Sequence, residues 1–227
     1  MNIVKLFSVS QGMSAIQRYS QLHLLKSESV MEHTGFVCLF TYNLCEEINA
    51  ASPDAHKLNT GKALQKAIVH DIDEVITGDI PRPTKYYSEE SKALFDKISE
   101  AGIDQIIREL EIEKINMKND WKNSKSGREG AIVAFADLSS VVYKLWEEIL
   151  MLGNRKLFRQ SIEVGKYLMH LERKIRNDSL FTQPQKRIIY KSIEQLYDIL
   201  RQIAETSDPV HGTMAVFEDW DCSAHHK

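Results

Sequence analysis

Histidine and carboxylate side chains recur along the chain in an arrangement suited to metal binding. His70 and Asp71 are adjacent, and Glu74 follows four residues after His70. In a continuous helix these three side chains lie on one side. His33 stands near the start of an earlier apolar stretch, and Asp137 lies inside the apolar run IVAFADLSSVVYKLW. Taken one at a time, each of these residues is more often structural than functional.

As a set, these residues predict a metal centre. A buried carboxylate such as that of Asp137 costs several kcal/mol unless it is paired or bound to a metal. Two imidazoles and two carboxylates form a mixed nitrogen and oxygen donor set, which suits Mn, Fe, Co, Ni or Zn. A cation held there polarises a phosphoryl oxygen and activates water near neutral pH. Glu74 is then placed to orient or deprotonate that water.

The elements that carry these residues are predicted to be helices. Apolar side chains recur at three- and four-residue steps, as in Val37, Phe40, Leu44 and Ile48, and no stretch alternates as a strand does. The fold class is therefore all-α. We expect helices over about 12–25, 30–50, 61–77, 88–118, 128–152, 155–178 and 183–207. Gly78 is expected to end the third helix. Residues 79–87, with two prolines, are expected to form an extended loop, and residues 119–127 a polar one.

Composition narrows the class of protein. With 43% hydrophobic and 27% charged residues in 227, the chain resembles an ordinary soluble globular protein. The net charge of -3 argues against a nucleic-acid binder. Cys38 and Cys45, seven residues apart in an apolar pattern, are predicted to be buried free thiols, and Cys222 completes an odd count. No signal peptide or membrane span is recognisable, which predicts a cytoplasmic protein with no membrane partner.

One domain is expected over residues 1–207, followed by a C-terminal tail, 208–227, which is either a docking arm or disordered.

Two longer motifs carry a family resemblance. The segments VMEHTGFV (30–37) and HDIDEVITGDIPRPTKYY (70–87) are similar to the EH and HDxxExxTGDxPTPxKY motifs of bacterial 5′-deoxynucleotidases. Those enzymes belong to the HD-domain metal-dependent phosphohydrolases, whose H…HD…D pattern resembles His33, His70-Asp71 and Asp137 here. The similarity covers about residues 12–175. It implies an HD-domain helical bundle with one divalent metal between helices, held by these four residues.

The resemblance also implies roles for residues around the metal. Glu74 would assist the attacking water, and Asp79 would contact the reacting region or take part in a further metal site. Arg18 matches an arginine that contacts the phosphate, and Lys85 matches the lysine of the PTPxKY element. Tyr19 stands where the relatives have a tryptophan beside the sugar. Without the motif, the arginine and the lysine would be read as solvated surface charges, and the tyrosine as a core residue.

Two departures from the pattern bear on the substrate. Tyr19 in place of tryptophan alters the surface that meets the sugar, and Arg82 stands where the family usually has threonine. A guanidinium in this loop suits bidentate phosphate binding, which hints at a substrate with more than one phosphate. Related phage enzymes remove triphosphate from dATP. With such a polyphosphate substrate, Mg would join the candidate metals.

The leading hypothesis is a deoxynucleoside 5′-monophosphatase, and its close alternative is a dNTP (dATP) triphosphohydrolase that releases tripolyphosphate. A non-catalytic nucleotide-binding protein remains a third, although no ligand is missing. A cyclic-nucleotide phosphodiesterase has no support in residues 70–87. The many apolar side chains on two sides of the helix expected over 128–152 indicate deep burial or a dimer contact. Because family relatives are oligomeric, we expect a homodimer or larger, in the cytoplasm of a bacterial cell or phage-infected host.

Overall fold

The structure is a computed structural model that describes residues 2–111 and 115–207. Those residues form helices and one isolated antiparallel bridge between Gln17 and Ser29, with no strand among them, so the all-α prediction is confirmed. No described helix is both long and apolar enough to cross a membrane. The predicted tail, 208–227, lies outside the described residues.

Contacts divide the described residues into two compact units, one of residues 2–22, 26–111 and 115–136, and one of residues 23–25 and 137–207. A single domain over 1–207 stays a prediction.

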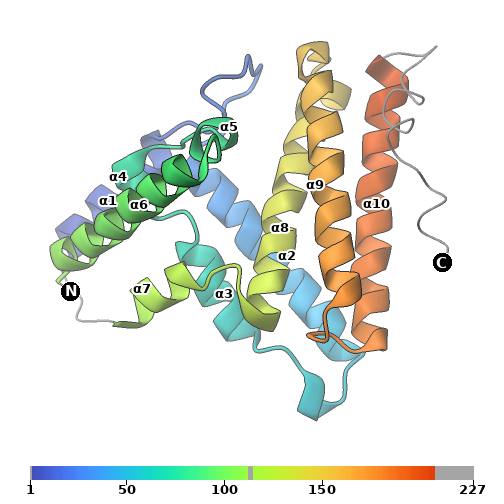
Figure 1. Cartoon of the computed structure of the whole chain (residues 1–227), viewed down its shortest axis with the longest axis horizontal. Helices are drawn as coiled ribbons and strands as arrows, with labels where there is room; N and C mark the ends of the chain where they lie inside the picture. Colours follow the sequence, from blue (N-terminus) through green and yellow to red (C-terminus); the bar gives the residue numbers. More distant parts are fainter. Residues whose placement is uncertain (1, 112–114, 208–227) are drawn as a thin grey trace. The chain divides into compact units, whose positions relative to one another are not determined.

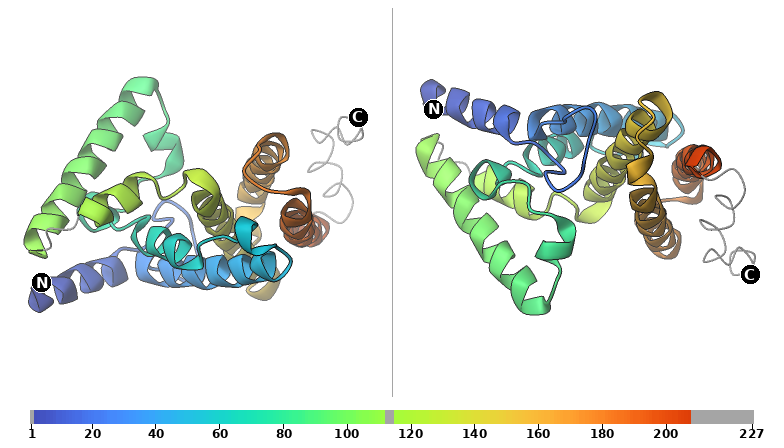
Figure 2. Two further views of the ribbon diagram at one scale, coloured as in Figure 1. Left: turned by 90° about the horizontal axis from the view of Figure 1, so that it is seen from below. Right: turned by 90° about the horizontal axis from the view of Figure 1, so that it is seen from above.

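The first unit holds most of the predicted site residues. Its α1 begins where α6 ends, because the Asn2 N–H donates to the Leu110 carbonyl (3.0 Å), and the two helices diverge from that point (Figure 2). Val9, Ile72 and Ile106 belong to the core that the helices share. The elements are α1 (Ile3–Ala15), α2 (Val30–Ala50), η1 (Asp54–His56), α3 (Thr60–Val69), α4 (Glu74–Thr77), α5 (Arg82–Lys85), α6 (Glu89–Glu109), α7 (Ile115–Lys122) and the start of α8 (Gly127–Leu145).

The prediction of a first helix over about residues 12–25 is wrong. The first helix begins earlier, where Asn2 caps it by accepting from the Lys5 N–H, and it ends at Ala15. The chain then turns back on itself. The Val30 N–H donates to the Ile16 carbonyl at 3.1 Å, beside the 17–29 bridge, so these backbone groups are satisfied outside a helix. Residues 18 and 19 therefore lie in a loop.

The helix expected over about 61–77 is interrupted. Helix α3 ends at Val69 and α4 starts at Glu74, while the turn between them uses tighter three-residue hydrogen bonds, such as that from the Glu74 N–H to the Asp71 carbonyl (3.1 Å). The prediction that His70, Asp71 and Glu74 lie on one side of a continuous helix is therefore wrong. The predicted stop at Gly78 is confirmed, and its φ of 71° is a conformation that glycine adopts without strain.

The predicted loops are narrower in the structure. Residues 79–87 contain one helical turn, α5, because Pro83 sits in its first turn, where a missing N–H costs nothing. The helix expected over 88–118 divides into α6 and α7. Since α7 continues to Lys122, only the second part of the expected polar loop remains.

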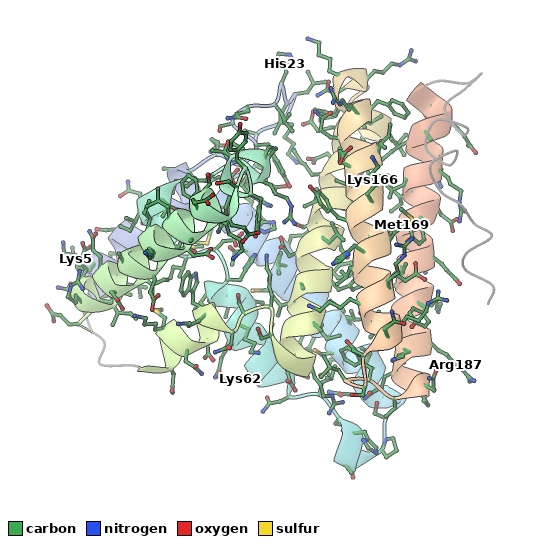
Figure 3. All side chains as sticks on the ribbon, viewed as in Figure 1. Lys5, His23, Lys62, Lys166, Met169 and Arg187 are labelled. Atoms are coloured by element: carbon green, nitrogen blue, oxygen red, sulfur yellow. The ribbon has the colours of Figure 1, made fainter. Side chains whose placement is uncertain are left out.

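The second unit contains the end of α8 and the helices that follow it. Helices α9 and α10 lie side by side and antiparallel (Figure 1), and Met169 of α9, labelled in Figure 3, packs with Tyr197 and Ala204 of α10. The elements after α8 are the π-helical segment η2 (Trp146–Met151), η3 (Arg155–Leu157), α9 (Phe158–Asn177) and α10 (Gln183–Ser207).

The π-helical segment turns two consecutive glutamates inward. Glu147 and Glu148 are both buried, and Lys144 Nζ lies 2.8 Å from the first and 3.3 Å from the second. The other Glu148 oxygen accepts the Leu25 N–H and the Asn154 side-chain amide, each at 2.8 Å. Buried charges persist when they are paired and hydrogen-bonded, as these are. The network ties residues 23–25 to the helix.

Candidate metal centre and active site

Two histidines and an aspartate of the first unit face one another. His33 Nε2 lies 3.2 Å from His70 Nε2 and 3.3 Å from Asp71 Oδ2, and the last two atoms are 3.1 Å apart. Both imidazoles are buried, and the Asp71 side chain is 17% exposed. These three are the group of possible metal ligands found in the described part of the chain. The sequence pattern thus predicted residues that the fold brings together.

Local structure fixes the direction of both imidazoles. His33 follows directly after Glu32, whose side chain completes a capping box with Ser29 at the start of α2. His70 is the C-cap of α3, and its Nδ1 donates to the Ala67 carbonyl at 2.7 Å. That bond fixes a proton on Nδ1, so Nε2, which faces the other two ligand atoms, is the nitrogen that can bind a metal once it releases its own proton.

The donor set fits a divalent cation. Atoms that are each about 2.1 Å from one metal stand roughly 3.0–3.4 Å apart in octahedral or tetrahedral geometry, which the three observed separations match. Burial alone would raise the pKa of Asp71, but the charge of His70 and hydrogen bonds from both histidines hold it well below its usual range. The carboxylate is therefore ionised, as a metal ligand must be.

Glu28 links the metal centre to Arg18. Its Oε1 accepts from Arg18 Nη1 at 3.1 Å and lies 4.0 Å from His33 Nδ1. The 17–29 bridge brings the arginine and the glutamate face to face, since the Arg18 N–H donates to the Glu28 carbonyl. A carboxylate behind a metal-binding imidazole orients the ring and raises its basicity. Sequence reasoning missed this residue because ten positions of loop separate it from its partner.

Asp79 holds the backbone of Tyr19. Its Oδ2 accepts the Tyr19 N–H at 2.7 Å, and Tyr19 has a φ of 60°, a conformation uncommon for a bulky residue. The Arg18 guanidinium lies 4.8 Å above the centre of the tyrosine ring. Asp79 therefore fixes a strained turn that presents the arginine and the aromatic ring together. Its predicted contact with the reacting region, or with a further metal, stays a prediction.

Glu74 combines a buried oxygen with a strongly shifted pKa. It begins α4, and its Oε2 is buried without a hydrogen-bond partner. Burial, then the negative charges of Asp71 and Asp79, raise the pKa of this carboxyl to about 10, while Arg18 lowers it. The Glu74 N–H donates to the Asp71 carbonyl at 3.1 Å, so Glu74 begins its helix one turn after the His70-Asp71 pair. A carboxyl that binds a proton this readily is suited to proton transfer.

The remaining predicted residues occupy different surroundings. Lys85 is partly buried, and its charge lowers the pKa of Asp73, which burial raises. Arg82 is exposed on α5, with its guanidinium 4.7 Å from the centre of the Tyr86 ring. Asp137 is half-buried on α8 and belongs to the second unit. The roles expected for Lys85, Arg82 and Asp137 stay predictions.

Comparison with known proteins identifies the same class of enzyme. Residues 5–183 match the family of YfbR-like 5′-deoxynucleotidases. A 5′-deoxynucleotidase of Shewanella oneidensis is 33% identical over 121 residues, which span 52% of this chain and 58% of the relative. Another, from Erwinia tasmaniensis, is 29% identical over 166 residues, which span 71% of this chain and 81% of that protein.

Solved structures share the fold. An HD-domain phosphohydrolase from Listeria innocua superposes with a TM-score of 0.65 at 22% identity, covering 96% of this chain and all of the other. The cyanophage S-2L HD phosphohydrolase DatZ, bound to dA and one catalytic Zn²⁺ ion, gives a TM-score of 0.52 at 18% identity, with 84% and 95% of the chains covered. The fold expectation is confirmed. With the family match over most of its length, the chain belongs to the YfbR-like 5′-deoxynucleotidases.

Proposed function

We propose that the protein hydrolyses 2′-deoxynucleoside 5′-monophosphates to deoxynucleoside and inorganic phosphate. His33, His70 and Asp71 would hold a divalent transition metal, Mn, Co, Fe, Ni or Zn, with Asp137 as a fourth ligand. The observation that carries the proposal is the triangle of two imidazole nitrogens and an ionised carboxylate oxygen, 3.1–3.3 Å apart. When bound, the metal supplies Lewis-acid polarisation of the phosphoryl oxygen and of water.

The surrounding residues handle charge and protons. Arg18, held by Glu28, donates to the phosphoryl oxygens, whose charge grows as the P–O bond breaks. Glu74 accepts the proton of the attacking water. Its raised pKa makes the ionised form a strong base, and neutralisation of Asp71 by a cation favours that ionised form. Lys85 adds a positive charge on the α5 turn, and Arg82 marks where a longer phosphate chain would extend.

Tyr19 is proposed to contact the sugar. Its ring lies beneath the Arg18 guanidinium, so a substrate whose phosphate reaches the arginine brings its ribose close to the tyrosine. An aromatic surface favours the apolar C2′ of deoxyribose over a hydroxyl that would lose hydrogen bonds to water. The preference for dAMP over AMP tests this role, and Tyr19→Ala is expected to reduce that preference.

The experiment begins with metal-stripped protein. Mn²⁺ or Co²⁺ is restored, and dAMP, dATP, AMP and ATP are supplied in parallel while the phosphate product is identified. Orthophosphate from dAMP supports the proposal, whereas tripolyphosphate from dATP assigns the triphosphohydrolase activity instead. His70→Ala is expected to abolish turnover, and His170→Ala, which removes an exposed histidine of α9, is its matched control. No turnover of any of the four by the parent would refute the proposal.

We also propose that the protein works in the cytoplasm as a homodimer or larger oligomer. Cys38 and Cys45 are free thiols, and Cys45 is buried with its pKa raised to about 12, which suits a reducing compartment. The assembly is supported by large apolar side chains that remain exposed on the first unit, among them Val4, Phe7 and Leu94. Gel filtration that gives a 26.1 kDa monomer would contradict the oligomer.

A further inference from the structure

The short helix α4, which Glu74 begins, depends on its neighbours for its position. It has only four residues, and a helix of one turn is unstable in water unless packing and hydrogen bonds hold it. Helix α4 packs against both α1 and α6 (Figure 1). A Cβ on Gly12 of α1 would stand 2.9 Å from the Val75 side chain, and one on Gly102 of α6 would stand 3.3 Å from that of Ile76. These two glycines therefore let the longer helices lie close against α4.

Asp73 fixes the N-terminal end of this helix. Its carbonyl accepts the Ile76 and Thr77 N–H groups at 2.9 Å and 3.1 Å. Its carboxyl group makes no capping hydrogen bond to the helix. Instead, Oδ1 accepts the indole N–H of Trp121, a residue of α7, at 2.8 Å. The residue before Glu74 is thus attached both to α4 and to α7.

The carboxyl group of Asp73 is enclosed by protein. The residue is 7% exposed, and burial raises its pKa, while hydrogen bonds from Ser99 of α6 and from Trp121 lower it. Ser99 is buried as well, and Trp121 packs against the core that contains Val69 and Ile72. A buried acceptor is costly to leave unpaired, so the bond to Trp121 holds Asp73 in one place.

The anchored backbone continues directly into Glu74. The Glu74 N–H donates to the Asp71 carbonyl at 3.1 Å, and its own carbonyl accepts the Gly78 N–H at 2.7 Å. Proton transfer requires the base within hydrogen-bond reach of the water, so a small displacement of this backbone would reduce the rate. We propose that Asp73, held by Trp121, is a positioning residue that fixes α4 and with it the Glu74 carboxyl. The inference rests on the proposed phosphatase function, because it concerns the residue that accepts the proton of the attacking water.

The kinetic test separates the hydrogen bond of Asp73 from its charge, on which the positive charge of Lys85 also acts. Asp73→Ala removes the acceptor and Trp121→Phe removes the donor. Each should lower kcat for dAMP about 10- to 100-fold and change KM by less than about threefold. Asp73→Asn loses the charge but keeps an oxygen for the indole N–H, so it should retain kcat within about threefold. An Asp73→Asn protein as slow as Asp73→Ala would show that the hydrogen bond is not the cause.

Ile106→Val is the matched control for a general loss of stability. Ile106 lies in the core against which Trp121 packs, and this change removes a buried apolar group without touching a polar one. It should keep kcat and KM within about twofold of the parent. Bound Mn²⁺ should be equal in all the variants, because no metal ligand is changed. A variant that loses its metal together with its activity, or a control that loses as much kcat, would overturn the positioning of Glu74.

Amide hydrogen exchange tests the anchoring of α4 without turnover. The N–H groups of residues 76–78 donate to carbonyls at the start of α4, and they should exchange at least about 10-fold faster in Asp73→Ala and Trp121→Phe than in the parent. Faster exchange together with reduced kcat supports the proposal. Unchanged exchange, or faster exchange with kcat retained, shows that the role of Asp73 is wrong. A parent that is inactive on deoxynucleotides contradicts the proposed function alone, and the exchange rates still decide whether Asp73 fixes α4.

Discussion

Replacing Glu74 with glutamine should stabilise the metal-free protein while removing its activity. Burial and the charges of Asp71 and Asp79 raise the pKa of Glu74 from an ordinary 4.5 to about 10. Between those values the folded protein keeps a proton that the unfolded chain releases, so stability falls as pH rises. At pH 8, which is 3.5 units above 4.5, the raised pKa of Glu74 lowers the free energy of unfolding by at most about 5 kcal/mol. At pH 5 the same loss is less than about 1 kcal/mol. Glutamine is neutral in both states and removes this cost.

Urea denaturation in EDTA at pH 5 and pH 8 measures the difference. The free energy of unfolding of Glu74→Gln should exceed that of the parent at both pH values. This gain in stability should be larger at pH 8 than at pH 5 by up to about 4 kcal/mol. Glu205→Gln, at an exposed position of α10, is the control and should show no such growth. Restoring Mn²⁺ should shrink the gain, because a cation beside Asp71 favours the ionised glutamate. A gain that is the same at both pH values would refute the assigned burial and charge environment.

Three further substitutions test the site. Asp137→Ala should lose both bound metal and activity, which metal analysis of the purified protein checks alongside dAMP turnover. Glu28→Gln should weaken metal affinity about 10- to 100-fold through His33, measured by competition with a chelator; unchanged affinity would remove Glu28 from the metal centre. Gly130→Ala should lower the free energy of unfolding, because a Cβ 2.7 Å from the Lys125 carbonyl carbon displaces the loop before α8. Equal urea midpoints for the variant and the parent would show that the loop accommodates the methyl group.

The cluster of His33, His70 and Asp71 was predictable because local sequence identifies its members. His33 and the His70-Asp71 pair stand in short motifs that name residue types at fixed spacing, and helix periodicity located α2 with the bounds that the structure shows, Val30–Ala50. What periodicity did not reveal was the interruption after Val69. Apolar residues continue at helical spacing through the turn, since Ile72 and Val75 pack on the same core as Val69. The pattern reports burial, and burial persists where the helix does not.

The supporting residues were unpredictable for a different reason. Arg18 was expected on a helix, yet it lies in a loop whose geometry depends on a bridge between positions 17 and 29. Glu28 reaches the site through a contact with a residue ten positions away, and Asp79 reaches the Tyr19 backbone from sixty positions away. No local pattern encodes such distances. From a single sequence, the candidate reacting residues are therefore easier to identify than the residues that orient them.

The π-helical segment after α8 has a consequence for how this family member can change over time. A π-helical turn arises from one extra residue in an α-helix, and here it directs Glu147 and Glu148 inward together. Deleting one residue between Trp146 and Met151 would restore α-helical spacing and rotate everything beyond it by about 100°. Glu148 would then release the Leu25 N–H that it now binds. The length of this segment is therefore constrained by the contact that it makes, and we expect insertions or deletions to be tolerated elsewhere first.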